Sequence, residues 1–99
     1  MPAPLTVPQI LRDGASTYEE RNCLYADNYK RIGQILAVLF PEGLPSMDAE
    51  GWNRFGVWFM AFNKLVRYAM QQQHGGNVDS AHDAMVYAAM LEELTRGRE

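Results

Sequence analysis

The feature that most constrains this chain is a long helical pattern of aromatic and aliphatic residues between Met47 and Gln72. Large apolar side chains recur there every three or four residues, which is the spacing of one face of an α-helix. No stretch alternates between apolar and polar residues for long, so β-strands have little support. The apolar stripe consists of Phe55, Trp58, Phe59, Phe62, Leu65, Val66 and Met70. The pattern predicts an all-α protein built around this helix.

Three shorter helices are expected beside the long one. The first spans about 6–13, because a threonine suited to N-capping begins it and Gly14 interrupts the pattern and starts a loop. The second spans about 27–40 and ends before Pro41, which cannot continue a helix. The last spans about 78–95 and follows a turn with two consecutive glycines. Four helices with short connections are typical of a compact antiparallel bundle.

The length and composition indicate a single globular domain. Its 99 residues correspond to one domain over 1–99 with a core at about 6–95, and a hydrophobic content of 47% is enough for that core. The net charge of −3 argues against general nucleic-acid binding, which usually needs a basic surface. A single cysteine, Cys23, allows no internal disulfide, and no apolar run approaches the roughly 20 residues that cross a bilayer. We therefore expect a cytoplasmic domain without a membrane segment.

The long helix also predicts self-association. Its tryptophans and phenylalanines are more typical of a core than of a platform for stacking nucleobases. A core of this size cannot cover all of them, so part of the stripe is expected to face another subunit. We therefore expect a homodimer or a higher homo-oligomer.

Two acids of the last helix are predicted beside its buried face. At about 100° per residue, Asp83 and Asp79 lie about 40° and 80° from Tyr87, which belongs to the apolar stripe. The other members of that stripe are Met90, Leu91 and Leu94. If the last two helices form a hairpin, Lys64 and Arg67 can reach these acids. A cationic partner is expected, because an acid among apolar neighbours costs several kcal/mol unless a cation or hydrogen bonds compensate.

The residues alone leave two interpretations of this acidic pair open. In the first, the pair is structural: Asp79 is stabilised by about 0.3–1 kcal/mol near the start of a helix, and Asp83 forms a salt bridge between helices. In the second, the two acids belong to a site that holds a metal ion or another ligand.

Several blocks of residues resemble a small all-α family that is common in bacteriophages and prophages and is catalogued as a domain of unknown function. The resemblance covers about residues 9 to 94. That family is in turn similar to the MazG-like nucleoside triphosphate pyrophosphohydrolases. The blocks are Arg21-x-x-x-Tyr25, Asn28-Tyr29-x-Arg31-Ile32, Met60-x-x-x-Lys64-x-x-Arg67 and Asp79-Ser80-x-x-Asp83-x-x-x-Tyr87-Ala88.

The resemblance implies a MazG-like bundle that binds a nucleotide or a related phosphate ligand and hydrolyses it with Mg²⁺. MazG-like enzymes hold magnesium with an E-E-x-x-E cluster on one helix and an E-x-x-D cluster on a later helix. By analogy, Asp79 and Asp83 would hold the metal, with Glu20 or Asp27 as a further ligand, and Lys64 would neutralise phosphate charge. The remaining ligand-binding residues would be Asn28, Arg31, Arg67 and Tyr87.

One departure from that pattern keeps a second function open. Glu19 and Glu20 are followed by Arg-Asn-Cys, so the first cluster reads E-E-x-x-C. The incomplete cluster favours a non-enzymatic phage protein that binds a host protein through its aromatic helix, for example a host-takeover or defence-inhibiting factor. Whether the chain is an enzyme therefore stays open at this point.

Other reactive residues carry weaker signals. His74 and His82 lack further cysteine or histidine at zinc-ligand spacing. Cys23 has no evident partner base, so we assign it to packing rather than to nucleophilic catalysis. The glycine pair before the last helix is not followed by the residues of a phosphate-binding loop and is expected to form a turn.

Overall fold

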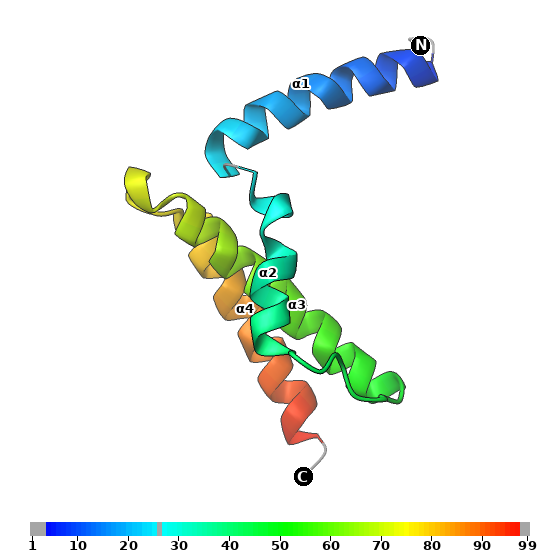
Figure 1. The fold of residues 1–99 in the computed structure, drawn as a ribbon, viewed down its shortest axis with the longest axis vertical. Coiled ribbons are helices and arrows are strands. Elements are labelled where there is room, and N and C mark those ends of the chain that lie inside the picture. The colour runs from blue at the N-terminus through cyan, green and yellow to red at the C-terminus, as the bar shows by residue number, and fades with distance from the viewer. Residues whose placement is uncertain (1–3, 26, 98–99) are drawn as a thin grey trace.

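The computed structural model describes residues 4–25 and 27–97, apart from the side chains of Leu24, Tyr25 and Asn28. Within these residues the structure is all-α and contains no strand (Figure 1). The α-helices are α1 (Val7–Tyr25), α2 (Ile32–Leu39), α3 (Ala49–Met70) and α4 (Val78–Arg96), and the 3-10 turns are η1 (Asn28–Lys30) and η2 (Gln72–His74). The predicted all-α class with four helices is confirmed.

Helix α1 is longer than the sequence pattern predicted. A capping box begins it: the Thr6 amide donates to Oε1 of Gln9 at 2.8 Å, and the Gln9 amide donates to Oγ1 of Thr6 at 3.4 Å. The expected end at Asp13 is wrong, because the helix passes through Gly14 and continues to Tyr25. A glycine inside a helix costs only about 0.5–1 kcal/mol, and good helix formers follow it.

Helices α3 and α4 form an antiparallel hairpin, and local capping sets where each begins. Asp48 accepts a hydrogen bond from the Gly51 amide at 2.8 Å, and Asn77 accepts one from the Ser80 amide at 3.2 Å. The turn between them uses Gly75–Gly76, which have a φ of 85° that glycine adopts at little cost. The hairpin boundaries lie within two residues of the predicted ones.

The hairpin is closed by small side chains. Ala61 on α3 is buried, as are Ser80 and Ala84 on α4. Helices with small residues at their contact can approach closely, so this part of the interface depends on close backbone packing rather than on large apolar side chains.

Helix α2 lies across the hairpin and brings an aromatic residue onto the long helix (Figure 1). Phe40 packs edge-to-face on Phe55 and Trp58, with ring centroids 6.2 and 5.5 Å apart. Trp58 in turn stacks on Phe62 at 5.2 Å. The aromatic residues of the predicted stripe therefore form the main apolar cluster, whereas its Leu65 is exposed, and no large side chain among the described residues is fully buried.

Helix α1 differs from the predicted compact bundle because it extends away from the other three helices (Figure 1). The radius of gyration is 17.3 Å and the molecule measures 52 × 37 × 28 Å, whereas a compact chain of this length has a radius of gyration of about 13 Å. Every residue over 4–21 is exposed. Only the C-terminal part of α1 is held against the rest of the described chain.

Candidate functional site

A pocket of about 380 Å³ lies where the C-terminal half of α1 meets η1 and α3. Two guanidinium groups, from Arg21 on α1 and Arg67 on α3, line it together with the tyrosines Tyr18 and Tyr29. The remaining lining residues are Gly14, Thr17 and Asn22. We call this the arginine–tyrosine pocket. None of its lining residues is acidic, so the pocket carries a positive charge and several hydrogen-bond donors.

The two tyrosines join α1 to η1 at the wall of this pocket. The hydroxyl oxygens of Tyr18 and Tyr29 lie 3.1 Å apart, and their rings meet edge-to-face with centroids 6.2 Å apart. This hydrogen bond is the main cause that raises the pKa of Tyr18 above its ordinary value. Tyr18 is therefore neutral at physiological pH. The ammonium of Lys30 lies 5.6 Å from the centroid of the Tyr29 ring.

A turn at Asp27 is joined to the pocket through Asn22, which lines the pocket. Asp27 has a φ of 59°, and its amide donates to Oδ1 of Asn22 at 3.0 Å. The Asp27 carboxylate also pairs with Lys30 at 3.3 Å. Hydrogen bonding with Asn22, and then with Lys30, lowers the pKa of Asp27, while the Asp27 hydrogen bond raises the pKa of Lys30. Asp27 was predicted as an alternative metal ligand, and in the structure its amide and carboxylate stabilise this turn.

The predicted cationic partner of Asp83 is Lys64. Lys64 Nζ lies 3.3 Å from Oδ2 of Asp83, and the pair joins α3 to α4. The two side chains are 24% and 45% exposed, so solvent screens the pair and its contribution is about 0–1 kcal/mol. This ion pair supports the structural interpretation of Asp83, in which the acid forms a salt bridge between two helices.

The predicted stripe of α4 is partly confirmed, since Tyr87, Leu91 and Leu94 are half-buried, but the most buried positions lie beside it. Ser80 and Ala84 are buried, whereas Met90, which was expected in the stripe, is exposed. Asp79 lies about 140° round the helix from Ala84 and is also exposed. The reason is that α4 meets α3 through its smallest side chains, which a search for large apolar residues overlooks. Asp79 is therefore exposed, whereas Asp83 is half-buried beside Lys64.

The acids proposed as magnesium ligands do not form one group in the part of the chain that the structure describes. Glu20 is exposed on α1, Asp79 is exposed on α4 and Asp83 pairs with Lys64. Over residues 4–25 and 27–97, no three carboxylate, histidine or cysteine side chains lie close enough to hold a metal ion. The described residues therefore place the proposed magnesium ligands on separate parts of the fold, with Glu20 on α1 and the two aspartates on α4.

The predicted ligand-binding residues are divided among different places. Arg67 lines the arginine–tyrosine pocket. Arg31 lies at the start of α2, where its Nη1 is 3.7 Å from the sulfur of Met70. Tyr87 is half-buried on α4 and does not line the pocket, and the side chain of Asn28 lies outside the described residues. The structure thus brings one predicted residue into the pocket.

Tyr18, Arg21 and Tyr29 are the main pocket residues that were not predicted as site residues. Arg21 was noticed only as part of the Arg21-x-x-x-Tyr25 block. Positions 14, 18, 21, 22 and 25 share one helix face, and this spacing would have revealed the pocket-facing side of α1. The assumption that Gly14 starts a loop concealed that face.

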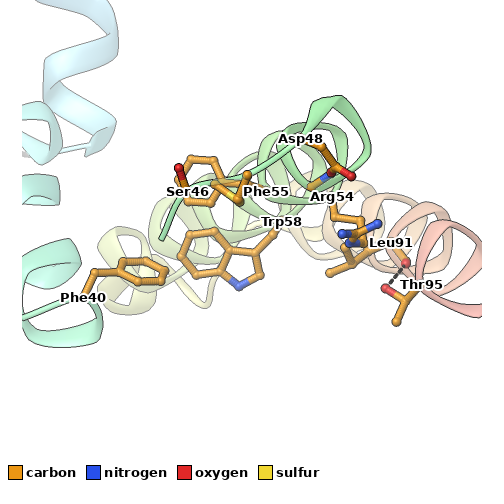
Figure 2. A pocket seen from close by; sticks show the side chains of 10 residues that line it. Phe40, Ser46, Asp48, Arg54, Phe55, Trp58, Leu91 and Thr95 are labelled. Atoms are coloured by element: carbon orange, nitrogen blue, oxygen red, sulfur yellow. Dashed lines mark hydrogen bonds between the residues drawn. The ribbon is translucent and has the colours of Figure 1, made fainter. Parts of the chain in front are cut away.

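A larger and more apolar groove of about 760 Å³ lies at the other end of the hairpin (Figure 2). Its apolar lining includes Phe40, Phe55, Trp58 and Leu91. The remaining lining residues are Ser46, Met47, Asp48, Gly51, Arg54 and Thr95. We call it the aromatic groove. Its chemistry suits an apolar segment of a protein better than a phosphate ligand.

Comparison of the chain with protein-family models, with curated proteins and with solved structures found no match in any of the three. None of the described helices combines the length and the apolar character that crossing a membrane requires. The described residues form a small all-α protein with a cationic pocket at one end of the hairpin and an apolar groove at the other.

Proposed function

We propose that this protein binds a nucleotide or a related small phosphate ligand in the arginine–tyrosine pocket. The observation that carries the proposal is that Arg21 and Arg67, from two different helices, line one pocket together with two tyrosines. A guanidinium group can donate two parallel hydrogen bonds to a phosphate. A tyrosine ring can pack against a nucleobase.

Charge and size both support an anionic ligand of this kind. The pocket has cationic, hydroxyl and amide groups in its lining but no carboxylate, and the neighbouring Asp27 carboxylate is paired with Lys30. Its volume of about 380 Å³ falls within the range of about 300–1,000 Å³ that is usual for small-ligand sites.

The finer part of the proposal comes from the resemblance to the MazG-like family. It assigns Mg²⁺-dependent hydrolysis to Asp79, Asp83 and Glu20, with Lys64 near the phosphates. The protein would act as a homodimer or a higher homo-oligomer in the cytoplasm. The described residues of one chain form no group of three metal ligands. We therefore propose phosphate binding in the pocket separately from metal-dependent hydrolysis.

A second candidate function is the binding of a host protein without catalysis. The observation in its favour is the exposure of large apolar side chains on α3, among them Trp52, Met60 and Leu65. Such side chains contribute strongly to protein interfaces.

Calorimetry with inorganic triphosphate and a panel of nucleoside triphosphates, with and without Mg²⁺, tests the proposed function. Arg21→Gln and Arg67→Gln should each weaken binding about tenfold or more, because a hydrogen bond to a charged group contributes about 1.5–3 kcal/mol. Arg12→Gln is the matched control, since Arg12 is on the same helix but does not line the pocket.

Two results would contradict phosphate binding in this pocket. One is the absence of binding to the wild-type protein, and the other is unchanged binding by Arg21→Gln. Measurement of pyrophosphate release with Mg²⁺ tests hydrolysis separately. Release that persists unchanged in Asp83→Ala would exclude the proposed role of Asp83.

A further inference from the structure

The chain exposes far more surface than a compact protein of its mass. Its accessible surface is 7794 Å² for 11.2 kDa, whereas a compact monomer of that mass exposes about 5,700 Å². The difference is about 2,100 Å². If two copies each buried that area, the interface would total about 4,200 Å², which falls in the range of about 2,000–5,000 Å² for obligate homodimers. The exposed excess is thus what a stable dimer needs.

Much of this exposed surface belongs to α1. Val7, Ile10 and Leu11 lie on one face of the helix and are 69%, 52% and 68% exposed. Further along the same face, Tyr18 reaches the arginine–tyrosine pocket. The apolar face therefore meets the chain's own body at its C-terminal end and is uncovered towards its N-terminal end. Most of the stability of a helix in a protein comes from packing of its apolar face, so this face needs a partner.

The aromatic groove is the matching feature on the rest of the molecule. Phe40 and Trp58 face it side by side, and Leu91 contributes from α4 (Figure 2). These rings form the main apolar cluster of the chain but remain only half-buried. An apolar helix face that entered the groove would complete their burial.

The groove and α1 of the same chain lie at different ends of the hairpin. Helix α1 meets α3 at Arg67, whereas the groove begins at Asp48. These residues are 19 positions apart along the sequence, which corresponds to about 28 Å along a helix. Helix α1 also points away from the hairpin (Figure 1). A chain held by the Asp27 turn therefore does not fill its own groove.

We propose that α1 of one copy of this chain occupies the aromatic groove of a second copy, and that the exchange is reciprocal. A twofold axis makes both contacts equivalent, as is usual for homodimers. The proposal deepens the homo-oligomer included in the proposed function by naming its contact surfaces. It does not depend on phosphate binding.

Light scattering after size exclusion tests whether the assembly forms through α1. The wild-type protein should have twice the mass of the 11.2 kDa chain. Leu11→Asp should weaken the dimer by about tenfold or more, because the substitution places a charge in an apolar contact. Ser16→Asp is the matched control on the opposite face of α1 and should leave the mass unchanged. A wild-type monomer whose radius of gyration in X-ray scattering is near 13 Å would overturn the proposal, since α1 would then pack on its own chain.

Disulfide trapping tests which surface receives α1. In a Cys23→Ser background, a Leu11→Cys protein is mixed with a Ser46→Cys protein, and the mixture is mildly oxidised. A linked heterodimer is expected, because Ser46 lines the groove. Gln73→Cys, on the exposed turn at the other end of the hairpin, should not link to Leu11→Cys. The proposed contact would be overturned if the wild-type protein is a dimer but Leu11→Cys links equally to Ser46→Cys and to Gln73→Cys, or links to neither. The mass and the disulfide linkage report on the dimer, whereas calorimetry of the wild-type protein with inorganic triphosphate reports on phosphate binding, so each proposal can fail without the other.

Discussion

Lys64 on α3 and Asp83 on α4 form an ion pair with a distance of 3.3 Å, and this pair joins the two helices of the hairpin. Both side chains remain partly exposed, so the pair orients the helices relative to one another without contributing much free energy. The same acid is the residue for which metal binding is proposed. The coupling free energy between Lys64 and Asp83 can be measured.

A double-mutant cycle with Lys64→Met and Asp83→Asn should give a coupling energy below about 1 kcal/mol. Solvent screening of the partly exposed pair is the reason. Urea unfolding of the four proteins measures the coupling. A coupling above about 3 kcal/mol would show that the pair is desolvated in solution and contradict its present geometry.

The two neighbouring glycines of the turn between α3 and α4 should respond differently to alanine. Both have a φ of 85°, so each substitution costs backbone strain of about 1–2 kcal/mol. A Cβ atom at Gly76 would lie 2.5 Å from Cζ of Tyr68, whereas one at Gly75 would meet nothing within 4 Å. Gly76→Ala should therefore be more destabilising than Gly75→Ala by about 1–3 kcal/mol in thermal unfolding. Equal losses would mean that the Tyr68 ring moves aside freely.

The α3–α4 contact should not tolerate a larger side chain at Ala84. This residue is buried on α4, so Ala84→Leu should destabilise the protein by about 1–3 kcal/mol through overpacking. Ala81→Leu on the same helix is the control, because Ala81 is exposed and leucine is a good helix former. Denaturant unfolding compares the two. A larger loss for Ala81→Leu would place the buried face of α4 elsewhere.

The Asp27 turn should have a defined pH dependence. Because the folded-state pKa of Asp27 is lowered, its stabilising contribution is present above the unfolded-state value of about 3.9 and is lost as the pH falls through the folded-state pKa. The raised pKa of Lys30 has the opposite sign: its contribution is present below the unfolded-state value of about 10.4 and is lost as the pH rises through the folded-state pKa.

Titration of Asp27 by NMR checks the first of these effects. Lys30→Met removes one of the groups that lower the pKa of Asp27, so the midpoint should rise in that variant. Lys64→Met is the control, because Lys64 pairs with Asp83 and not with Asp27. An Asp27 midpoint that is the same in wild type and Lys30→Met would exclude this ion pair in solution.

The hairpin was predictable because its signals are local. The caps and glycines that delimit α3 and α4 are adjacent in sequence to the elements they end, and the aromatic stripe repeats over many turns. A salt bridge of Asp83 with Lys64 or Arg67 was expected from the same helical spacing, and the structure forms the one with Lys64. The helical spacing of apolar residues is therefore enough to predict most of the α3–α4 hairpin.

The path of α1 and the buried face of α4 were not predictable in the same way. Gly14 lowers the helix propensity of α1 but does not end it, because the residues that follow favour the helix. On α4, Ser80 and Ala84 face α3 although neither looks like a core residue by size. The arginine–tyrosine pocket depends on the path of α1, so Arg67 could be predicted as a ligand-binding residue but not as a partner of Arg21.

The extended α1 has a mechanical consequence for the pocket at its base. Arg21 and Leu11 belong to the same continuous helix and are about 15 Å apart along its axis. Because α1 is one continuous helix, a tilt at its Leu11 end would also move Arg21 relative to Arg67. The separation of the two guanidinium groups would then depend on where the distant end of α1 is held. Coupling between two binding sites is reciprocal. An anion that fixes this separation would therefore change the affinity of α1 for its binding surface by the same factor as α1 binding changes the affinity for the anion.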